Sequence, residues 1–224
     1  MFAMVDEGQG SGGIGLMSAL PGELGTWSGL GEVVFRGGGF QVRRVVEEGE
    51  EVFTCVSGVG KVCGARAAEA LLGAGVRRGI LIVGTCGALT GGIQAGALVH
   101  CGEAVQADLG LDKGRKVRAD GHLLEAWESV AEGQRVGFLT ADRAVMTPWR
   151  RWRARQLVSG PCVADMETAA AGAAAEAWGV PWAALRAVTD HAGWGSHKAF
   201  QKRYPVQAGR AADTVRGLLA QIRA

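Results

Sequence analysis

The chain has 224 residues, of which 48% are hydrophobic and 21% charged, and its 37 glycines follow no three-residue period. This composition excludes an intrinsically disordered chain and a collagen, and the length suits one domain with a sizeable core. The 24 Lys and Arg residues against 22 Asp and Glu residues give a net charge of +2, so charge favours neither nucleic acid nor an anionic membrane as partner. A small molecule is the expected partner.

The first 13 residues predict a flexible N-terminal tail, with a single domain over residues 14–224. The tail has no basic segment followed by an apolar one, so it does not resemble a signal peptide. The longest apolar stretches, such as residues 79–89, are shorter than the roughly 18–20 residues that cross a membrane. The five cysteines are widely spaced and form no C-x-x-C pair, which favours reduced thiols. We therefore expect a cytoplasmic protein without a metal site.

Strand-like and helix-like segments alternate along the chain, as is typical of a sheet with helices on both faces. Alternating or continuous apolar runs predict strands, and a period near 3.6 predicts helices. In chain order, we expect strands at 14–20 and 51–58, a helix at 61–74, strands at 79–84 and 97–105, a helix at 121–132, strands at 134–140 and 161–165, a helix at 166–178, a strand at 181–190 and a helix at 206–223. No linker or internal repeat divides the chain, so the pattern indicates one α/β domain.

Two glycine-rich motifs and one basic segment suggest nucleotide chemistry only superficially. GSGGIG (10–15) precedes the first strand, whereas a dinucleotide fingerprint follows it. SGVGK (57–61) lacks the earlier glycine of a phosphate loop and has Val62 where Ser or Thr would hold a metal. Residues 141–156 are dense in Arg and Trp, and an exposed amphipathic turn or helix with Trp149 and Trp152 packed down explains them more simply than a nucleic-acid patch.

Three acidic residues lie where predicted strands end and helices begin, which is where open α/β sheets bind ligands. They are Glu23, Glu167 and Asp190. Each also has a structural explanation: Glu23 as a first-turn acid, Glu167 as a partner of the helix dipole beside an Asp165 cap, and Asp190 as the acceptor of an Asx-turn. Singly, each structural explanation is at least as good as a functional one.

The order of motifs along the chain resembles the nucleoside phosphorylase/nucleosidase family. The resemblance covers IGLMSALPGEL (14–24), SGVGKVCGARAAEALL (57–72), VGTCGAL (83–89) and ADMETAAAGAAAEAWGVPWAALRAVTD (164–190). It implies a mixed central sheet flanked by helices on both faces, and no cofactor. Within the family, the chain is most similar to 5′-methylthioadenosine/S-adenosylhomocysteine nucleosidases, and next to futalosine hydrolases. The resemblance thus implies hydrolysis of a 5′-modified adenosine, with release of adenine, in purine and methionine salvage.

The resemblance also implies roles for individual residues. Asp190 corresponds to the general acid that protonates N7 of a purine, and partial burial is expected to raise its pKa. Glu167 corresponds to the ligand of the ribose hydroxyls, and a first-turn position is expected to favour its ionised form. Glu23 corresponds to the general base that deprotonates water. The implied substrate-binding residues are Thr85, Cys86, Gly87, Val145, Asp165, Met166, Thr189 and Phe200.

Several positions depart from the family pattern. Arginines that bind phosphate in the phosphorylases are replaced by Ile82 and by the SALPGEL segment (18–24), so water is the expected nucleophile. Asp165 stands where nucleosidases usually have glutamate. The aromatic residue that stacks on the base aligns with Ala144, so Trp149 or Trp152 would have to supply that surface. Phe200 matches the aromatic residue of the 5′ pocket.

Two other readings remain open on the sequence. A purine nucleoside phosphorylase would use the same acid with phosphate in place of water, and a protein that binds nucleosides without turnover would keep the fold alone. Family members assemble as dimers or hexamers in which a neighbour closes the 5′ pocket, so a homodimer is expected.

Overall fold

The computed structural model describes residues 12–109, 115–143, 147–193 and 195–223. The predicted tail at 1–13 falls almost wholly outside these ranges, although its last residue, Gly13, already belongs to the first strand. The strands are β1 (Gly13–Ser18), β2 (Glu32–Gly37), β3 (Phe40–Glu47), β4 (Glu50–Val56), β5 (Val76–Ala88), β6 (Leu98–Gln106), β7 (Arg115–Arg118), β8 (Gln134–Thr140), β9 (Cys162–Asp165) and β10 (Trp182–Asp190). The helices are a short 3-10 helix η1 (Pro21–Trp27) and α1 (Lys61–Gly73), α2 (Gly121–Val130), α3 (Pro148–Arg155), α4 (Thr168–Ala177), α5 (Ser196–Gln207), α6 (Arg210–Asp213) and α7 (Val215–Arg223).

The strands form one mixed sheet in the order β10-β6-β8-β9-β5-β1-β4-β3-β2, with β7 on β6. Strand β5 pairs in parallel with β1 and β10, and its last residues pair antiparallel with β9. Because β5 also pairs with β10, the segment from β10 to β5 closes into a ring. Gly87 on β5 is in register with both Asp190 on β10 and Ala164 on β9, so the ends of three strands meet at one point.

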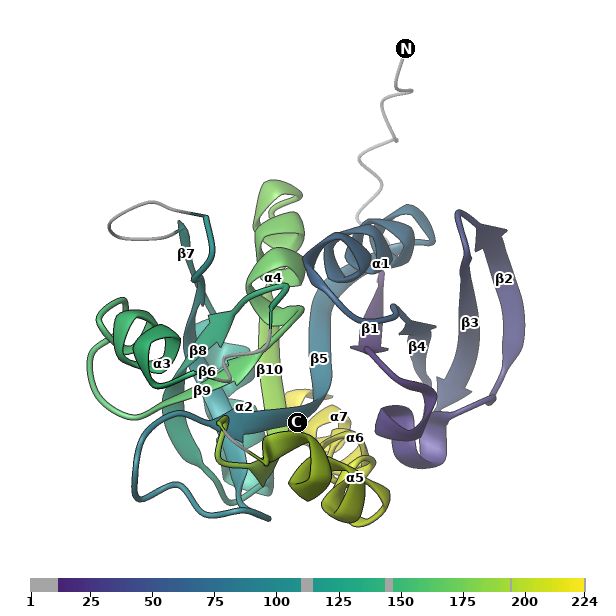
Figure 1. Ribbon diagram of the computed structural model, residues 1–224. Helices are drawn as coiled ribbons and strands as arrows, with labels where there is room; N and C mark the ends of the chain where they lie inside the picture. Colours follow the sequence, from purple (N-terminus) through teal and green to yellow (C-terminus); the bar gives the residue numbers. More distant parts are fainter. Residues whose placement is uncertain (1–11, 110–114, 144–146, 194, 224) are drawn as a thin grey trace.

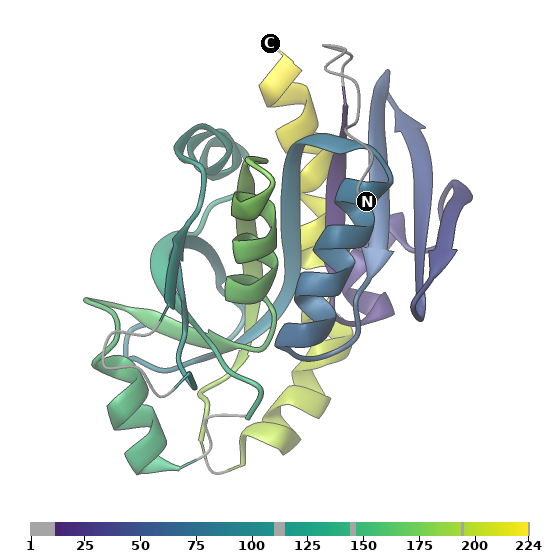
Figure 2. The same ribbon diagram turned by 90° about the horizontal axis from the view of Figure 1, so that it is seen from above.

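Helices cover both faces of the sheet, as the sequence predicts (Figure 1). Helices α1 and α4 lie side by side on one face, and α2 packs against α7 on the other (Figure 2). Small residues allow the close approach of α4: a Cβ at Gly172 would lie 2.7 Å from the Trp182 ring. Among the described residues, no helix has both the length and the apolar character needed to cross a bilayer.

The predicted strands and three of the four predicted helices are confirmed to within a few residues, whereas the helix at 206–223 is wrong. The chain there completes α5 at Gln207, forms the short α6 and continues as α7. The break coincides with Gly209, where a Cβ would lie 2.8 Å from the Cα of Gly25 in η1. The close approach of η1 requires a residue without a side chain at this position, and a hydrophobic stripe in the sequence does not reveal this contact. Strands β2, β3 and β7 and most of α5 were not predicted.

Segment 141–156 contains the helix α3, but its tryptophans are not packed down. Trp149 and Trp152 are 65% and 54% exposed and stack on each other with their ring centroids 5.0 Å apart. Ala154 is buried, and the half-buried Arg151 donates hydrogen bonds to the carbonyls of Leu89 (2.9 Å) and Ala192 (3.1 Å). The expectation fails because an arginine, rather than the aromatic pair, holds the helix to the domain.

Candidate active site

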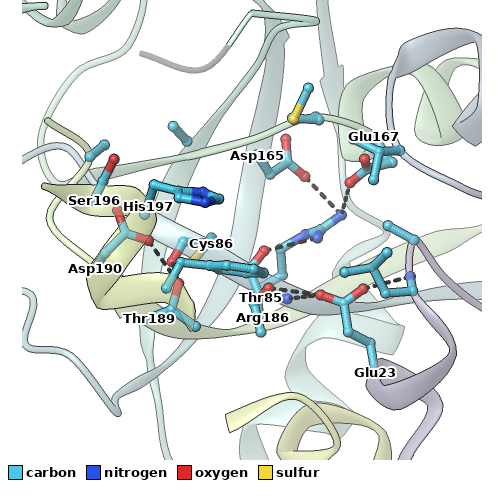
Figure 3. Close-up of a pocket in the computed structure, with 18 of the residues that line it drawn as sticks. Glu23, Thr85, Cys86, Asp165, Glu167, Arg186, Thr189, Asp190, Ser196 and His197 are labelled. Atoms are coloured by element: carbon cyan, nitrogen blue, oxygen red, sulfur yellow. Dashed lines mark hydrogen bonds and ion pairs between the residues drawn. The ribbon is translucent and has the colours of Figure 1, made fainter. Parts of the chain in front are cut away.

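A cavity of about 300 Å³ opens where β5, β9 and β10 end (Figure 3). It is lined by nearly all the site residues predicted from the sequence: Glu23, Thr85, Cys86, Gly87, Asp165, Met166, Glu167, Thr189, Asp190 and Phe200. Val145, also predicted, and Ala144 lie outside the described residues. The fold therefore brings together side chains that are up to 177 positions apart in the chain, between Glu23 and Phe200.

Glu23 lies in the first turn of η1 and is only 2% exposed. Its Oε2 accepts a hydrogen bond from the Leu20 amide (3.0 Å), and its Oε1 accepts bonds from the amide (2.9 Å) and the hydroxyl (2.7 Å) of Thr85. Gly84 permits this approach, since its φ is +149° and a Cβ there would lie 3.0 Å from Glu23 Oε1. Three donors thus fix the carboxylate against the end of β5.

Arg186, on β10, is the cation at the centre of the site and is 2% exposed. Its Nη2 lies 3.0 Å from Asp165 Oδ2 and 3.2 Å from Glu167 Oε2. Its Nη1 donates to the Thr85 carbonyl (3.0 Å), and its Nε donates to Thr168 Oγ1 (3.2 Å). One guanidinium therefore organises two buried carboxylates and the end of β5.

Glu167 is the residue just before α4 and is 3% exposed. Its Oε1 accepts a hydrogen bond from the Gly60 amide (2.9 Å), while its Oε2 faces Arg186. Burial raises the pKa of Glu167 from 4.5 to about 7; Arg186 opposes this shift and Asp165 adds to it. Glu167 precedes the first turn of α4 instead of lying in it, and burial is the largest influence on its pKa, so the expected preference for the ionised form is opposed here.

Replacing Glu167 with glutamine is expected to remove a pH dependence of stability, so that the variant gains stability relative to wild type as the pH rises. Because folding raises the pKa of Glu167, this group stabilises the native state below pH 4.5, and its contribution is lost as the pH rises through about 7. A shift of this size corresponds to roughly 3 kcal/mol at pH 8. Urea unfolding of wild type and Glu167→Gln at pH 5 and pH 8 measures the effect. A stability difference that is the same at both pH values would contradict it.

Asp190 ends β10 at the other side of the cavity and is 8% exposed. Its Oδ2 accepts a hydrogen bond from the Thr189 hydroxyl (2.8 Å), and a Cβ at Gly87 would lie 3.0 Å from its Oδ1. Burial raises the pKa of Asp190, although the Thr189 hydroxyl, His191 and Arg203 oppose the shift. This is the direction that a general acid requires.

The other predicted binding residues complete the walls. Burial raises the pKa of the Cys86 thiol, which keeps it protonated and unsuited to nucleophilic attack. Asp165 Oδ1 accepts a bond from the Thr140 hydroxyl (2.5 Å), and its Oδ2 accepts one from the Thr168 amide (3.0 Å), so it caps α4 as well as pairing with Arg186. Among the described residues, no group of three His, Cys, Asp or Glu side chains has the arrangement of a metal site.

Among the cavity-lining residues that the sequence analysis missed, three have a basic side chain: Arg143, Arg186 and His197. For Arg186 a signal exists, since an arginine inside an otherwise apolar strand must have a buried partner. Arg143 and His197 lie on exposed loop and helix positions, where charge and spacing carry no such signal.

Comparisons with known proteins agree with this fold. The model of the phosphorylase superfamily matches residues 13–220. A 5′-methylthioadenosine/S-adenosylhomocysteine nucleosidase from Geobacillus thermodenitrificans is 28% identical in an alignment 208 positions long, which covers 85% of this chain and 87% of the relative.

Two solved structures are similar at 19–22% identity. An S-adenosylhomocysteine nucleosidase from Streptococcus pyogenes, in complex with 5-methylthiotubericidin, has a TM-score of 0.85, with 94% of this chain and 97% of that chain covered at 22% identity. A futalosine hydrolase mutant from Helicobacter pylori has a TM-score of 0.86, with 94% and 99% covered at 19% identity. Because the family model matches nearly the whole described domain, the chain belongs to the phosphorylase superfamily.

Proposed function

We propose that this protein hydrolyses the N-ribosidic bond of a 5′-modified adenosine, of the methylthioadenosine or S-adenosylhomocysteine type, and releases adenine. The observation that carries the proposal is that Glu23, Glu167 and Asp190 line one cavity. The name of the Geobacillus relative supports the choice of substrate. Cleavage of this bond passes through an oxocarbenium-like sugar, so it needs an acid for the base, an anion near the sugar and an activated water.

Asp190 is the proposed general acid. Its raised pKa favours the protonated form, which can transfer a proton to N7 of the leaving purine. The Thr189 hydroxyl orients the carboxyl group, and Gly87 leaves room for it against β5. Proton transfer lets the purine leave as a neutral molecule instead of an anion, which lowers the barrier to cleavage of the N-ribosidic bond.

Glu167 is the proposed ligand of the ribose hydroxyls. When ionised, it places a negative charge beside the developing positive sugar, which stabilises the transition state more than the neutral substrate. Met166, the preceding residue, lines the same cavity and is proposed to pack against the ribose. The pKa of about 7 means that activity should rise as Glu167 ionises around neutral pH.

Glu23 is the proposed general base. A carboxylate has about four acceptor positions, of which Leu20 and Thr85 occupy three. The remaining position can accept a proton from a water molecule placed between Glu23 and the sugar. Because the three donors fix the carboxylate, little reorganisation is needed when the water is deprotonated.

Arg186 supports water rather than phosphate as the nucleophile, although it is an arginine in the cavity. Its guanidinium already binds Asp165, Glu167, Thr168 and the Thr85 carbonyl. A phosphate dianion would meet these carboxylates and Glu23 with no uncommitted charge from Arg186 to offset the repulsion. The commitments of Arg186 therefore support a hydrolase.

The direct test is adenine release from methylthioadenosine by the pure protein in phosphate-free buffer. Turnover with appearance of a reducing sugar supports the proposal. If micromolar enzyme releases no adenine while adenine raises the melting temperature, the protein binds nucleosides without turnover.

Replacing Asp190 with asparagine is expected to lower kcat by on the order of 10²-fold. The amide can still donate a hydrogen bond to the base but cannot transfer a proton, so part of the stabilisation remains. A 4-nitrophenyl riboside, whose leaving group needs no protonation, should be cleaved by wild type and Asp190→Asn at similar rates. Equal losses on both substrates would argue against the role of Asp190 as acid.

Futalosine should be assayed beside methylthioadenosine, because the residues that line the cavity do not determine which base and which 5′ group it binds. Phe200 is the only Phe, Tyr or Trp that lines the cavity within the described part of the chain, and Trp149 and Trp152 are exposed instead of covering it. In the described structure, Trp149 and Trp152 therefore do not supply the stacking surface that the family pattern implies. Val59 lines the cavity and is 50% exposed, which is consistent with the proposal that a second subunit of a homodimer closes it.

A further inference from the structure

The SGVGK motif (57–61) lacks the pattern of a phosphate-binding loop. In the structure it connects the cavity to a second charged cluster. Val59 lines the cavity, and the next amide, of Gly60, donates to Glu167 Oε1 (2.9 Å). The following amide, of Lys61, donates to Asp142 Oδ1 (2.8 Å). Two successive amides at the start of α1 thus hold two carboxylates, one inside the cavity and one in the loop after β8.

Lys61 continues this contact with its side chain. Its Nζ lies 2.5 Å from Asp108 Oδ1 and 3.7 Å from Asp142 Oδ2, and Asp108 Oδ2 accepts a bond from the Asp142 amide (2.9 Å). The Lys61 side chain is only 14% exposed. Although burial alone would raise it, the pKa of Asp108 is lowered, because Lys61 and the Asp142 amide bind the carboxylate. We call Lys61, Asp108 and Asp142 the Lys61 network.

The network joins three parts of the chain that are distant in sequence: the start of α1, the loop after β6 and the loop after β8. Gly60 makes this meeting possible, because its φ is +106° and a Cβ there would lie 3.2 Å from Asp142 Oδ1. The loop after β8 carries Arg143, which lines the cavity. A shielded cation between two carboxylates holds such a junction better than an exposed pair, whose contribution is small.

We propose that the Lys61 network is a positioning device for the active site: it holds the Gly60 amide against Glu167 and keeps residues 141–143 at the cavity. None of its three members lines the cavity in the described structure, so they act through Gly60 and Arg143 rather than on the substrate. The inference rests on the proposed function in assigning Glu167 to the substrate.

The charge on Glu167 is the property that the network should control. Glu167 faces Arg186 from β10, Asp165 from β9, Glu23 from η1 and the Gly60 amide from α1. Of these, only the Gly60 amide is attached to the network. If the amide moves away, Glu167 loses a donor that stabilises its ionised form, and its pKa rises further above the ordinary value. The pH at which activity appears should rise with it.

The test replaces Lys61 with methionine, which keeps an unbranched side chain, one atom shorter, and removes its charge. We expect the acid limb of its pH profile to move to higher pH by about one unit, and kcat/KM at pH 6 to fall about tenfold, since below the pKa a shift of one unit changes the ionised fraction tenfold. Lys61→Arg, which keeps the cation, should restore the wild-type limb. Lys116→Met removes the more exposed Lys116–Glu103 pair elsewhere and should leave the profile unchanged.

A second readout does not depend on turnover. The ¹⁵N–¹H chemical shift of the Gly60 amide should follow the ionisation of Glu167 in wild type and lose this dependence in Lys61→Met. If wild type releases no adenine but the Gly60 amide titrates as described, the proposed function fails and the positioning role stands. If Lys61→Met does not fold, Asp108→Asn makes the same test. An unshifted acid limb, or a Gly60 amide that titrates as in wild type, would overturn the proposal.

Discussion

Replacing Arg186 with leucine is expected to lower the free energy of unfolding by about 3–5 kcal/mol at pH 8, because it leaves buried carboxylates without their cation. Asp165 and Glu167 would remain beside each other, with side chains 0% and 4% exposed. Protonation relieves this repulsion, so the deficit should shrink as the pH falls. Urea unfolding at pH 8 and pH 5 measures both effects.

Arg135→Leu is the matched control for this variant. Arg135 pairs with Glu128 at 2.5 Å, but its side chain is 50% exposed, so its loss should cost about 1 kcal/mol or less. If Arg186→Leu were no more destabilised than Arg135→Leu, the carboxylates would not depend on Arg186 for their burial. The account of the site as a charge-compensated cluster would then be wrong.

Glu23→Gln is expected to lower kcat by about 10³–10⁴-fold, which is the upper end of the range for the loss of a general base. Glutamine cannot accept a proton from water, and unlike the asparagine at position 190 it offers the transition state no substitute contact. Its amide nitrogen would also face a backbone donor at Leu20 or Thr85, which costs about 1–3 kcal/mol of stability.

Two measurements separate lost chemistry from lost structure in Glu23→Gln. Steady-state kinetics gives kcat and KM, and a thermal shift with adenine reports whether the cavity still forms. We expect the ligand-induced shift to persist while turnover disappears. Substantial residual turnover, within tenfold of wild type, would mean that another group activates the water.

The sequence predicts the topology well where each element has its own pattern. Buried strands such as β8 and β10 are apolar on both faces, and their bounds agree with the prediction to within one residue. The predicted site residues on β5, β9 and β10 converge because these three strands end near Gly87. The order of the strands in the sheet brings these ends together, and the family motifs imply that order. Val145 remains untested in the structure, and the catalytic roles remain predictions.

The parts that sequence reasoning missed depend on contacts between distant segments. The break after α5 lies at Gly209, which packs against the backbone of Gly25, and α3 is held by hydrogen bonds from Arg151 instead of by its tryptophans. Glu167 is the clearest case: its position near the start of α4 predicts a lowered pKa, whereas its burial raises the pKa. The spacing of residues along the chain reveals neither these contacts nor the burial of Glu167.

The central claim, that the buried carboxylates direct water onto the sugar, is tested most directly by identifying the pentose formed in phosphate buffer. Mass spectrometry distinguishes the free pentose from its 1-phosphate, and parallel reactions with and without phosphate give the rates of adenine release. We predict the free pentose and equal rates in both buffers. A pentose 1-phosphate, formed only when phosphate is present, would contradict the account.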